Sequence, residues 1–374
     1  MNEPVLYATS AQVHLDHIEA NLRAIRERVG DRFVLVAVKA NAYGHGAAQV
    51  ASMIERTGVA DWLGVATVPE ALELRAVGIS IPILKLSQAF PEELVAAVEA
   101  GVVLTVVDEA SADAAQQAAA SVSTTAEVHV KVDTGMRRIG VEPPNAPALA
   151  AYVARQPNLH LTGIFTHLPV SDTPLQDPFT EDQSDRFADV VGEVEAAIGA
   201  PLPYVHAANS GGVLAHPSTW HTMVRPGIMA YGSYPDPATP RTVDLLPGLS
   251  LTTRVSYVKR VRQGETVGYG RTWTAPADTT IVTIPVGYGD GYSRLLSNRG
   301  EVLIGGSRRP IAGRVCMDQT MVDVGDDPVR VGDPVTLIGT QGGQQITASD
   351  VAAWMGTIPY EVTCLLTDRV TRTY

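Results

Sequence analysis

The chain has 374 residues, of which 45% are hydrophobic and 18% are charged. This length predicts two or three domains, and the composition excludes a disordered protein. With 28 Lys and Arg against 40 Asp and Glu, the net charge is −12. That charge argues against nucleic-acid binding, because no basic excess is available to neutralise phosphates. An acidic surface also fits poorly with anionic membranes.

The cysteine content and the N-terminus suggest a soluble cytoplasmic protein. Cys316 and Cys364 are the only cysteines, too few for a disulfide framework. The opening sequence MNEPVLYATS has neither the basic nor the apolar region of a secretory signal. No apolar run reaches the roughly 18 residues of a transmembrane helix.

Eight short apolar runs follow one another along the first 232 residues. They are FVLVAVKA (33–40), WLGVAT (62–67), IPILKL (81–86), VVLTVVD (102–108), AEVHVKVDT (126–134), LTGIFTH (161–167), YVHAANS (204–210) and MVRPGIMAYG (223–232). Nearly continuous apolarity is typical of strands buried on both faces, as in a parallel sheet.

Helical patterns separate these runs. Residues 14–29 carry apolar side chains at helical spacing, Pro91 is suited to the first turn of another helix, and Thr180–Gln183 reads as a capping box for a helix that ends near Ile198. The alternation predicts a (β/α)8 barrel, a TIM barrel, over residues 11–240. The alternative is a doubly wound sheet, but KANAYGHG after the first strand lacks the G-x-G-x-x-G pattern.

The pattern changes after residue 240. Short alternating runs such as LTTRVSYVKRV, TTIVTIPVGYG and GRVCMDQTMVDVG are separated by Gly and Pro turn signals. They predict a mainly antiparallel β domain over residues 241–374, and we expect residues 1–10 to pack with it.

Polar residues stand where the predicted barrel strands end, and active sites of such barrels lie at that end. These residues are Lys39, Asp133, His167, Asn209, Ser210 and Arg225. Lys39 follows an almost purely apolar strand. It is either a lysine that extends to solvent or a desolvated amine able to form a Schiff base with a carbonyl. The segment Asn41–Gly46 favours the second interpretation, because its glycines allow close approach of a ligand and Tyr43 brings a hydroxyl donor beside the lysine.

The segment VKANAYGHG (38–46) resembles the cofactor-lysine signature of bacterial alanine racemases, and the likeness runs along nearly the whole chain. The other matching segments are VKVDTGMRRIG (130–140), ANSGG (208–212), VRPGIMAYG (224–232), VGYGRTWTA (267–275), VGYGDGYSR (286–294), AGRVCMDQ (312–319) and YEVTCLLTDRV (360–370). The resemblance implies a fold-type III pyridoxal 5′-phosphate enzyme that works as a homodimer. Each active site would lie between one subunit's barrel and the other's β domain.

The resemblance also implies the catalytic residues. Lys39 would bind the cofactor covalently and act as one base, and Tyr269 of the partner subunit would act as the other. Inversion of a carbon centre needs two bases on opposite faces, one to remove the proton and one to return it. Free tyrosine and lysine titrate near about 10 and 10.4, so both need lowered pKa values to act as bases near neutrality.

Further residues match the cofactor and substrate contacts of the family. Arg225 would bind the pyridine nitrogen, and His167 would connect Arg225 with the catalytic tyrosine. Tyr43, Ser210, Gly227, Ile228 and Tyr360 would contact the phosphate, and Asn209 would position the edge of the ring. The substrate carboxylate would lie against Arg138, whose guanidinium suits a planar carboxylate, and the backbone of the partner subunit's Met317. Lys131 matches a lysine that is carbamylated in many members. The remaining matches form a substrate access corridor: Asp172, Tyr288, Arg294, Arg314 and Ile358. No metal site is expected.

Two segments depart from the family pattern. Arg137 stands where a glycine is common, and KLSQAFPEEL (85–94) replaces a stretch of small residues. The expected function is interconversion of L-alanine and D-alanine, which supplies D-alanine for peptidoglycan. The alternatives are a serine or broad-specificity racemase, a non-catalytic pyridoxal phosphate carrier, and a Schiff-base aldolase barrel without the cofactor.

Overall fold

The computed structural model describes residues 6–374, which divide into two compact units. One unit comprises residues 18–42 and 46–245, and the other comprises residues 6–17, 43–45 and 246–374. Within residues 6–374, no helix is both long enough and apolar enough to cross a membrane.

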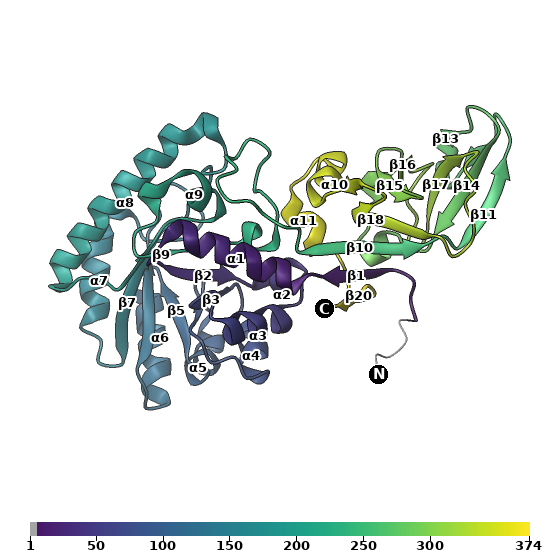
Figure 1. The fold of residues 1–374 in the computed structure, drawn as a ribbon. Coiled ribbons are helices and arrows are strands. Elements are labelled where there is room, and N and C mark those ends of the chain that lie inside the picture. Colours follow the sequence, from purple (N-terminus) through teal and green to yellow (C-terminus); the bar gives the residue numbers. More distant parts are fainter. Residues whose placement is uncertain (1–5) are drawn as a thin grey trace. The chain divides into compact units, whose positions relative to one another are not determined.

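The first unit is a barrel of eight parallel strands, surrounded by helices in Figure 1. The strands are β2 (Phe33–Ala37), β3 (Trp62–Val65), β4 (Ile83–Lys85), β5 (Val102–Val106), β6 (Ala126–Lys131), β7 (Leu159–Phe165), β8 (Tyr204–His206) and β9 (Met223–Val224). Strand β2 pairs with both β3 and β9. Between β8 and β9, Thr222 N donates to Val205 O and Arg225 N donates to Ala208 O. These bonds nearly close the barrel.

The helices of this unit cover the outside of the strands. They are α1 (Leu15–Val29), α3 (Ala47–Thr57), α4 (Val68–Ala76), α5 (Pro91–Glu99), α6 (Glu109–Ser121), α7 (Ala146–Ala154) and α8 (Asp177–Ile198), with the short α2 (Lys39–Tyr43) and α9 (Ser210–Ala215) at strand ends. The predicted start of α8 at Thr180 is wrong, because Thr180 is buried inside the helix. Pro178 lies in the first turn, where its fixed φ favours an earlier start.

The second unit is built on two main sheets, with a third sheet of only two short strands (266–267 and 273–274). The larger has the order β16–β15–β18–β10–β1–β20, with β19 added to β18, and the smaller has the order β11–β14–β17. The strands are β1 (Ser10–Val13), β10 (Leu249–Arg254), β11 (Tyr257–Val261), β12 (Thr266–Val267), β13 (Trp273–Thr274), β14 (Thr279–Ile284), β15 (Glu301–Ile304), β16 (Ser307–Pro310), β17 (Thr320–Gly325), β18 (Pro334–Gln341), β19 (Gln344–Ile346) and β20 (Thr371–Thr373). Two short helices, α10 (Ala348–Met355) and α11 (Pro359–Cys364), complete the unit.

The predicted fold class, a barrel followed by a mainly antiparallel β domain, is confirmed. The division differs from the predicted boundaries at residues 11–17, 43–45 and 241–245. Residues 11–17 belong to the β unit, where β1 pairs with β10 and β20. Residues 1–5 of the predicted N-terminal segment lie outside the described residues.

Candidate active site

Lys39 begins a turn of left-handed helix at the end of strand β2. Ala40, Asn41, Ala42 and Tyr43 all have φ between 51° and 53°, a conformation that costs about 1–2 kcal/mol for each residue with a Cβ. The turn persists because its polar groups are bonded: Ala42 N donates to Val38 O, and Ala40 N donates to the Glu70 carboxylate at 2.7 Å. The structure therefore fixes the backbone on both sides of the lysine.

We expect Ala40→Gly to leave stability unchanged or to raise it by up to about 1 kcal/mol, because glycine adopts a positive φ without strain. Ala40 is exposed, so no packing is lost. The matched control is Ala48→Gly in the right-handed helix α3, which should cost about 1 kcal/mol. Thermal unfolding of the two variants compares them, and equal destabilisation would argue against the left-handed turn.

Cationic side chains gather at the carboxyl ends of the barrel strands. Arg225 follows β9, which is adjacent to β2 in the sheet, and Lys131 ends β6. Burial lowers the pKa of Lys131 to about 7, helped by the charges of Arg225, Arg138 and Lys39. The structure thus brings together four of the predicted site residues.

His167, after β7, belongs to the same cluster. Burial lowers its pKa well below the usual value, and Arg225, Arg138, Lys131 and Lys39 lower it further. A neutral imidazole beside these cations is able to accept a hydrogen bond as well as donate one.

Arg225 is anchored by three hydrogen bonds. Its Nη2 donates to Thr166 O at 2.7 Å and to Ala207 O at 3.0 Å, and its Nη1 donates to His206 Nδ1 at 2.9 Å. Burial lowers the pKa of Arg225 to about 9. The imidazole bonded to Arg225 is thus His206, which the sequence interpretation missed although a histidine in the apolar run YVHAANS was a visible signal.

Ser210 and Asn209 form a polar hub between β8 and β9. Ser210 Oγ accepts hydrogen bonds from Gly227 N at 3.0 Å and Met229 N at 3.4 Å, next to Ile228. Asn209 caps α9 by accepting from Gly212 N, and its amide donates to Leu168 O. The predicted phosphate contacts of this unit therefore lie together, and Asn209 helps to shape their loop.

The β unit contains the other two predicted phosphate contacts. The rings of Tyr43 and Tyr360 have centroids 5.9 Å apart, and burial raises the pKa of Tyr43. Gly44 brings Tyr43 close to helix α11, since a Cβ at this position would lie 2.1 Å from Thr363 O. The glycine in the cofactor-lysine segment therefore has a steric explanation.

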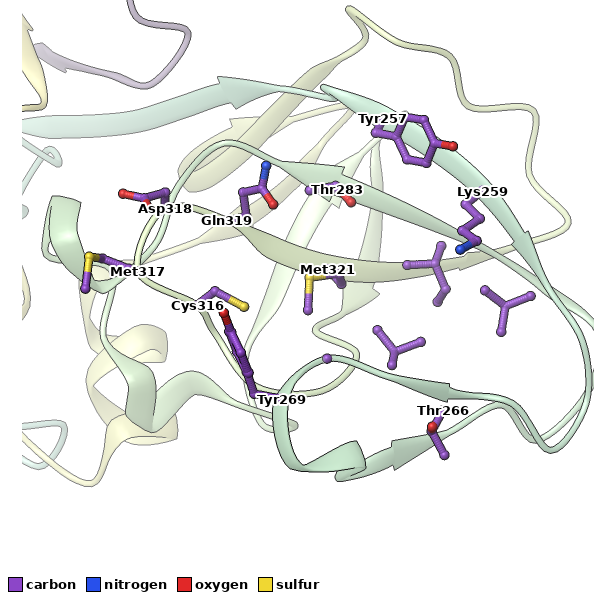
Figure 2. A pocket seen from close by; sticks show the side chains of 14 residues that line it. Tyr257, Lys259, Thr266, Tyr269, Thr283, Cys316, Met317, Asp318, Gln319 and Met321 are labelled. Atoms are coloured by element: carbon purple, nitrogen blue, oxygen red, sulfur yellow. The ribbon is translucent and has the colours of Figure 1, made fainter.

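Tyr269 projects from a turn between two glycines of the β unit. Gly268 and Gly270 have φ of 75° and 71°, and a Cβ on Gly270 would lie 3.0 Å from the Arg314 guanidinium. The Tyr269 side chain is 72% exposed. It lines an open cavity of about 710 Å³, shown in Figure 2, together with Tyr257, Lys259, Cys316, Met317 and Met321.

The loop that contains Tyr288 packs against the backbone of Met317 in the same unit. Gly289 N donates to Met317 O at 2.8 Å, and a Cβ on Gly287 would lie 2.4 Å from that oxygen. The buried Asp290 accepts from Gly287 N and pairs with Arg369, which also bonds Asp318. Met317 and Tyr288, both exposed, are therefore held in one framework.

The other predicted corridor residues lie in both units. Arg294 and Ile358 are exposed in the β unit, where Arg314 is half-buried, and Asp172 is half-buried in the barrel unit. Burial raises the pKa of Asp172.

The two departures from the family pattern have physical explanations. Arg137 adopts φ 58°, so it retains the conformation that glycine would favour, and its guanidinium pairs with Glu142 at 2.6 Å. In segment 85–94, Lys85 Nζ donates to Gln88 O, and Lys131 Nζ donates to Leu86 O. Both lysines therefore fix the loop after β4.

The donor set of the barrel fits pyridoxal 5′-phosphate. Lys39 offers a primary amine, Arg225 offers a buried guanidinium, and Arg138 and Lys131 add cationic groups to the same cluster. The cofactor needs an amine for its aldehyde, a donor for its ring nitrogen, and polar hydrogens for its phosphate dianion. Lys39, Arg225 and Ser210 are the residues that would hold these three parts.

Residues 13–235 match the N-terminal domain of alanine racemase, and residues 248–374 match its C-terminal domain. The chain belongs to the alanine racemase family. Alanine racemases are isomerases that depend on pyridoxal 5′-phosphate, and the predicted family is thus confirmed.

Individual alanine racemases are similar over their full length. The alanine racemase of Cutibacterium acnes is 50% identical over 97% of this chain and 96% of its own. Among solved structures, that of Clostridium difficile superposes with a TM-score of 0.93 at 34% identity, covering 99% of this chain and 96% of its own. The alanine racemase of Bacillus anthracis, solved with bound L-Ala-P, gives a TM-score of 0.91 at 35% identity, covering 99% and 95%.

Proposed function

We propose that this chain interconverts L-alanine and D-alanine with Lys39 and Tyr269 as the two bases. The observation that carries the proposal is the placement of Lys39 and Arg225 at the carboxyl ends of adjacent strands in a chain of this family. Pyridoxal phosphate, when bound, withdraws electrons from the Cα–H bond of the substrate amino acid. The side chains of the protein then determine where the proton goes.

Each site residue has a defined role in this proposal. The amine of Lys39 holds the cofactor and moves a proton on one face of the substrate Cα, and the phenol of Tyr269 moves it on the other. Arg225 keeps a permanent donor on the ring nitrogen, which opposes protonation of that nitrogen. Arg138 and the backbone of the partner subunit's Met317 bind the substrate carboxylate.

Circular dichroism of the purified protein tests the function. We expect the signal of L-alanine to decay to zero when catalytic amounts of protein and cofactor are added, and that of L-serine to change much more slowly. Equal rates for both amino acids would support the broad-specificity alternative. A protein that binds the cofactor but leaves both signals constant would support the non-catalytic carrier. A protein that never acquires the cofactor absorbance would support the aldolase.

The proposed active unit is a homodimer with shared sites. Tyr269 and Met317 belong to the β unit, are exposed, and line its open cavity, whereas Lys39 belongs to the barrel unit. Exposed side chains of this kind are available to a second copy of the chain. This arrangement agrees with the family resemblance.

Complementation tests the shared site. Lys39→Ala and Tyr269→Phe chains, each nearly inactive alone, should regain about a quarter of wild-type activity when they are co-expressed in equal amounts. Half of the random dimers are mixed, and one of the two sites in each mixed dimer has both native residues. Activity that stays at the level of the single variants would show that both bases come from one chain.

We further propose that the neutral amine of Lys131 adds to carbon dioxide, which forms an N–C bond and releases one proton to solvent, to give a carbamate that supports Arg138. With a pKa near 7, this amine is largely neutral and nucleophilic at mildly alkaline pH. In protein equilibrated with ¹³C-bicarbonate, a carbamate NMR signal should grow as the pH rises through about 7 and be absent from Lys131→Gln. Lys259→Gln, at an exposed position, is the control that should keep the signal. A signal that survives in Lys131→Gln would assign the modification elsewhere.

The cellular role follows from the reaction. D-alanine is a component of peptidoglycan, so the proposed role is its supply for the cell wall, as is standard for the family. The cytoplasmic location expected from the sequence remains part of this proposal.

A further inference from the structure

Two buried histidines extend inward from Arg225 through the interior of the barrel. His206 Nδ1 lies 2.9 Å from Arg225 Nη1, and His206 Nε2 lies 3.0 Å from His129 Nδ1. Both imidazoles are completely buried. No acidic side chain pairs with Arg225 among the ion pairs of residues 6–374, and its hydrogen bond to an ionisable side chain is the one to His206.

Arg225, His206 and His129 form a hydrogen-bonded row. Its hydrogen bonds can be donated in only one direction. A guanidinium donates and never accepts, so His206 Nδ1 must present a lone pair to Arg225. In a neutral ring the proton of His206 is then on Nε2, and it is donated to His129 Nδ1. By the same rule, the proton of His129 is on its own Nε2. That atom is buried and has no hydrogen-bond partner in the described part of the chain.

The surroundings hold both rings in the neutral state. Burial lowers the pKa of His129 to about 3 and that of His206 well below its usual value, and the charge of Arg225 lowers both further. A proton added to either ring would place N–H groups against each other in the row or a second cation beside Arg225.

Packing fixes where the rings lie. His206 stacks on Phe165 with a centroid distance of 4.8 Å and an interplanar angle of 3°. His129 packs against the rings of Trp62 and Tyr204, with centroid distances of 5.6 and 5.7 Å, and those two rings are themselves 4.7 Å apart. A Cβ on Gly163 would lie 2.7 Å from three atoms of the His129 imidazole, so a glycine on β7 makes room for this ring.

We propose that His129 is a positioning residue that holds His206 in its Nε2–H tautomer, so that Arg225 always meets a hydrogen-bond acceptor. The hydrogen bonds that connect His129 with Arg225 run through His206. The acceptor row orients the guanidinium, whose remaining donors then point in a constant direction. The inference rests on the proposed role of Arg225 toward the cofactor ring.

Nitrogen NMR of protein labelled with ¹⁵N-histidine tests the tautomer directly, in the cofactor-free protein. We expect His206 to be protonated on Nε2 alone in the wild type. In His129→Leu the Nε2–H of His206 loses its buried acceptor, so His206 should shift to a mixture that includes an Nδ1–H form in which the hydrogen bond from Arg225 is broken. His129→Asn places an amide oxygen near the former Nδ1 position and should restore the wild-type pattern.

Affinity for pyridoxal phosphate, titrated into the cofactor-free protein, gives a second readout. We expect a loss of about 10-fold in His129→Leu and a return to within about threefold in His129→Asn. The control is His221→Asn, because His221 also has a buried Nε2 without a partner but, within residues 6–374, forms no hydrogen bond with His206 or His129. That variant should leave both the tautomer of His206 and the affinity unchanged.

The outcomes distinguish this inference from the proposed function. A wild-type His206 protonated on Nδ1 would overturn the inference about His129. This result needs no variant, so it can be obtained even if His129→Leu fails to fold. A variant that only melts earlier, with an unchanged tautomer and unchanged affinity, would assign His129 a purely structural role. Failure of alanine racemisation would contradict the proposed function and leave the tautomer result unaffected.

Discussion

Replacing Lys39 with alanine is expected to abolish covalent attachment of pyridoxal phosphate and to lower racemisation by at least about 10⁴-fold. The loss combines two functions in one side chain, because Lys39 is both the anchor of the cofactor and a base. The left-handed turn after Lys39 holds its backbone through Ala40 N and the Glu70 carboxylate. A small side chain at this position should therefore remove the amine without displacing the turn.

Absorption spectra, borohydride reduction and peptide mass measurement check this result. Wild-type protein should retain the reduced cofactor on the peptide that contains residue 39, and the variant should retain none. Lys85→Met is the matched control, since Lys85 also lies at the end of a barrel strand but bonds the carbonyls of its own loop. A reduced cofactor found on Lys131 in wild-type protein would reassign the anchor.

Most of the barrel was predictable because its signal is local. A run such as FVLVAVKA contains enough consecutive apolar residues to mark a buried strand, and β2 begins at Phe33 as the pattern predicts. The errors occur at the ends of strands and helices. Strand β9 ends after only two residues because Pro226 follows Arg225, and α8 begins before its predicted cap because Pro178 favours an earlier start.

The site was predictable only in part, because side chains meet across strands that are distant in sequence. Lys39 and Arg225 were identified as strand-end residues, and the pairing of β2 with β9 brings their strands together. The row from Arg225 to His129 joins β9, β8 and β6. The spacing of residues along the chain does not predict which side chains meet across strands. A lone histidine in an apolar strand is usually a hydrogen-bonded core residue.

The amino-acid sequence also does not predict the backbone conformation of two segments of the site. Four consecutive non-glycine residues adopt a positive φ after Lys39, and Arg137 does so at a position where glycine is common in the family. Intrinsic preferences disfavour both conformations. They persist because hydrogen bonds such as the one that Arg137 N donates to Asp133 Oδ1 fix the local backbone.

The Tyr269→Phe variant is expected to lose proton abstraction from L-alanine by about 10²–10⁴-fold, while abstraction from D-alanine falls by less than about 10-fold. Phenylalanine retains the ring and loses only the hydroxyl that moves the proton. The control is Tyr257→Phe, another exposed tyrosine that lines the same cavity, and it should leave both rates unchanged.

Steady-state rates cannot reveal this difference between L-alanine and D-alanine. Enantiomers have equal free energies in water, so the equilibrium constant of the reaction is one. The kcat/KM values in the two directions must therefore fall together in any variant. The asymmetry is visible only as exchange of the Cα hydrogen with deuterium from the solvent, before inversion is complete.

If Lys39 serves D-alanine, it removes the proton and returns a deuteron to the same face, so the recovered D-alanine is labelled. L-alanine should remain unlabelled, because its face has lost the phenol. Equal labelling of both enantiomers would show that Tyr269 does not serve the L face.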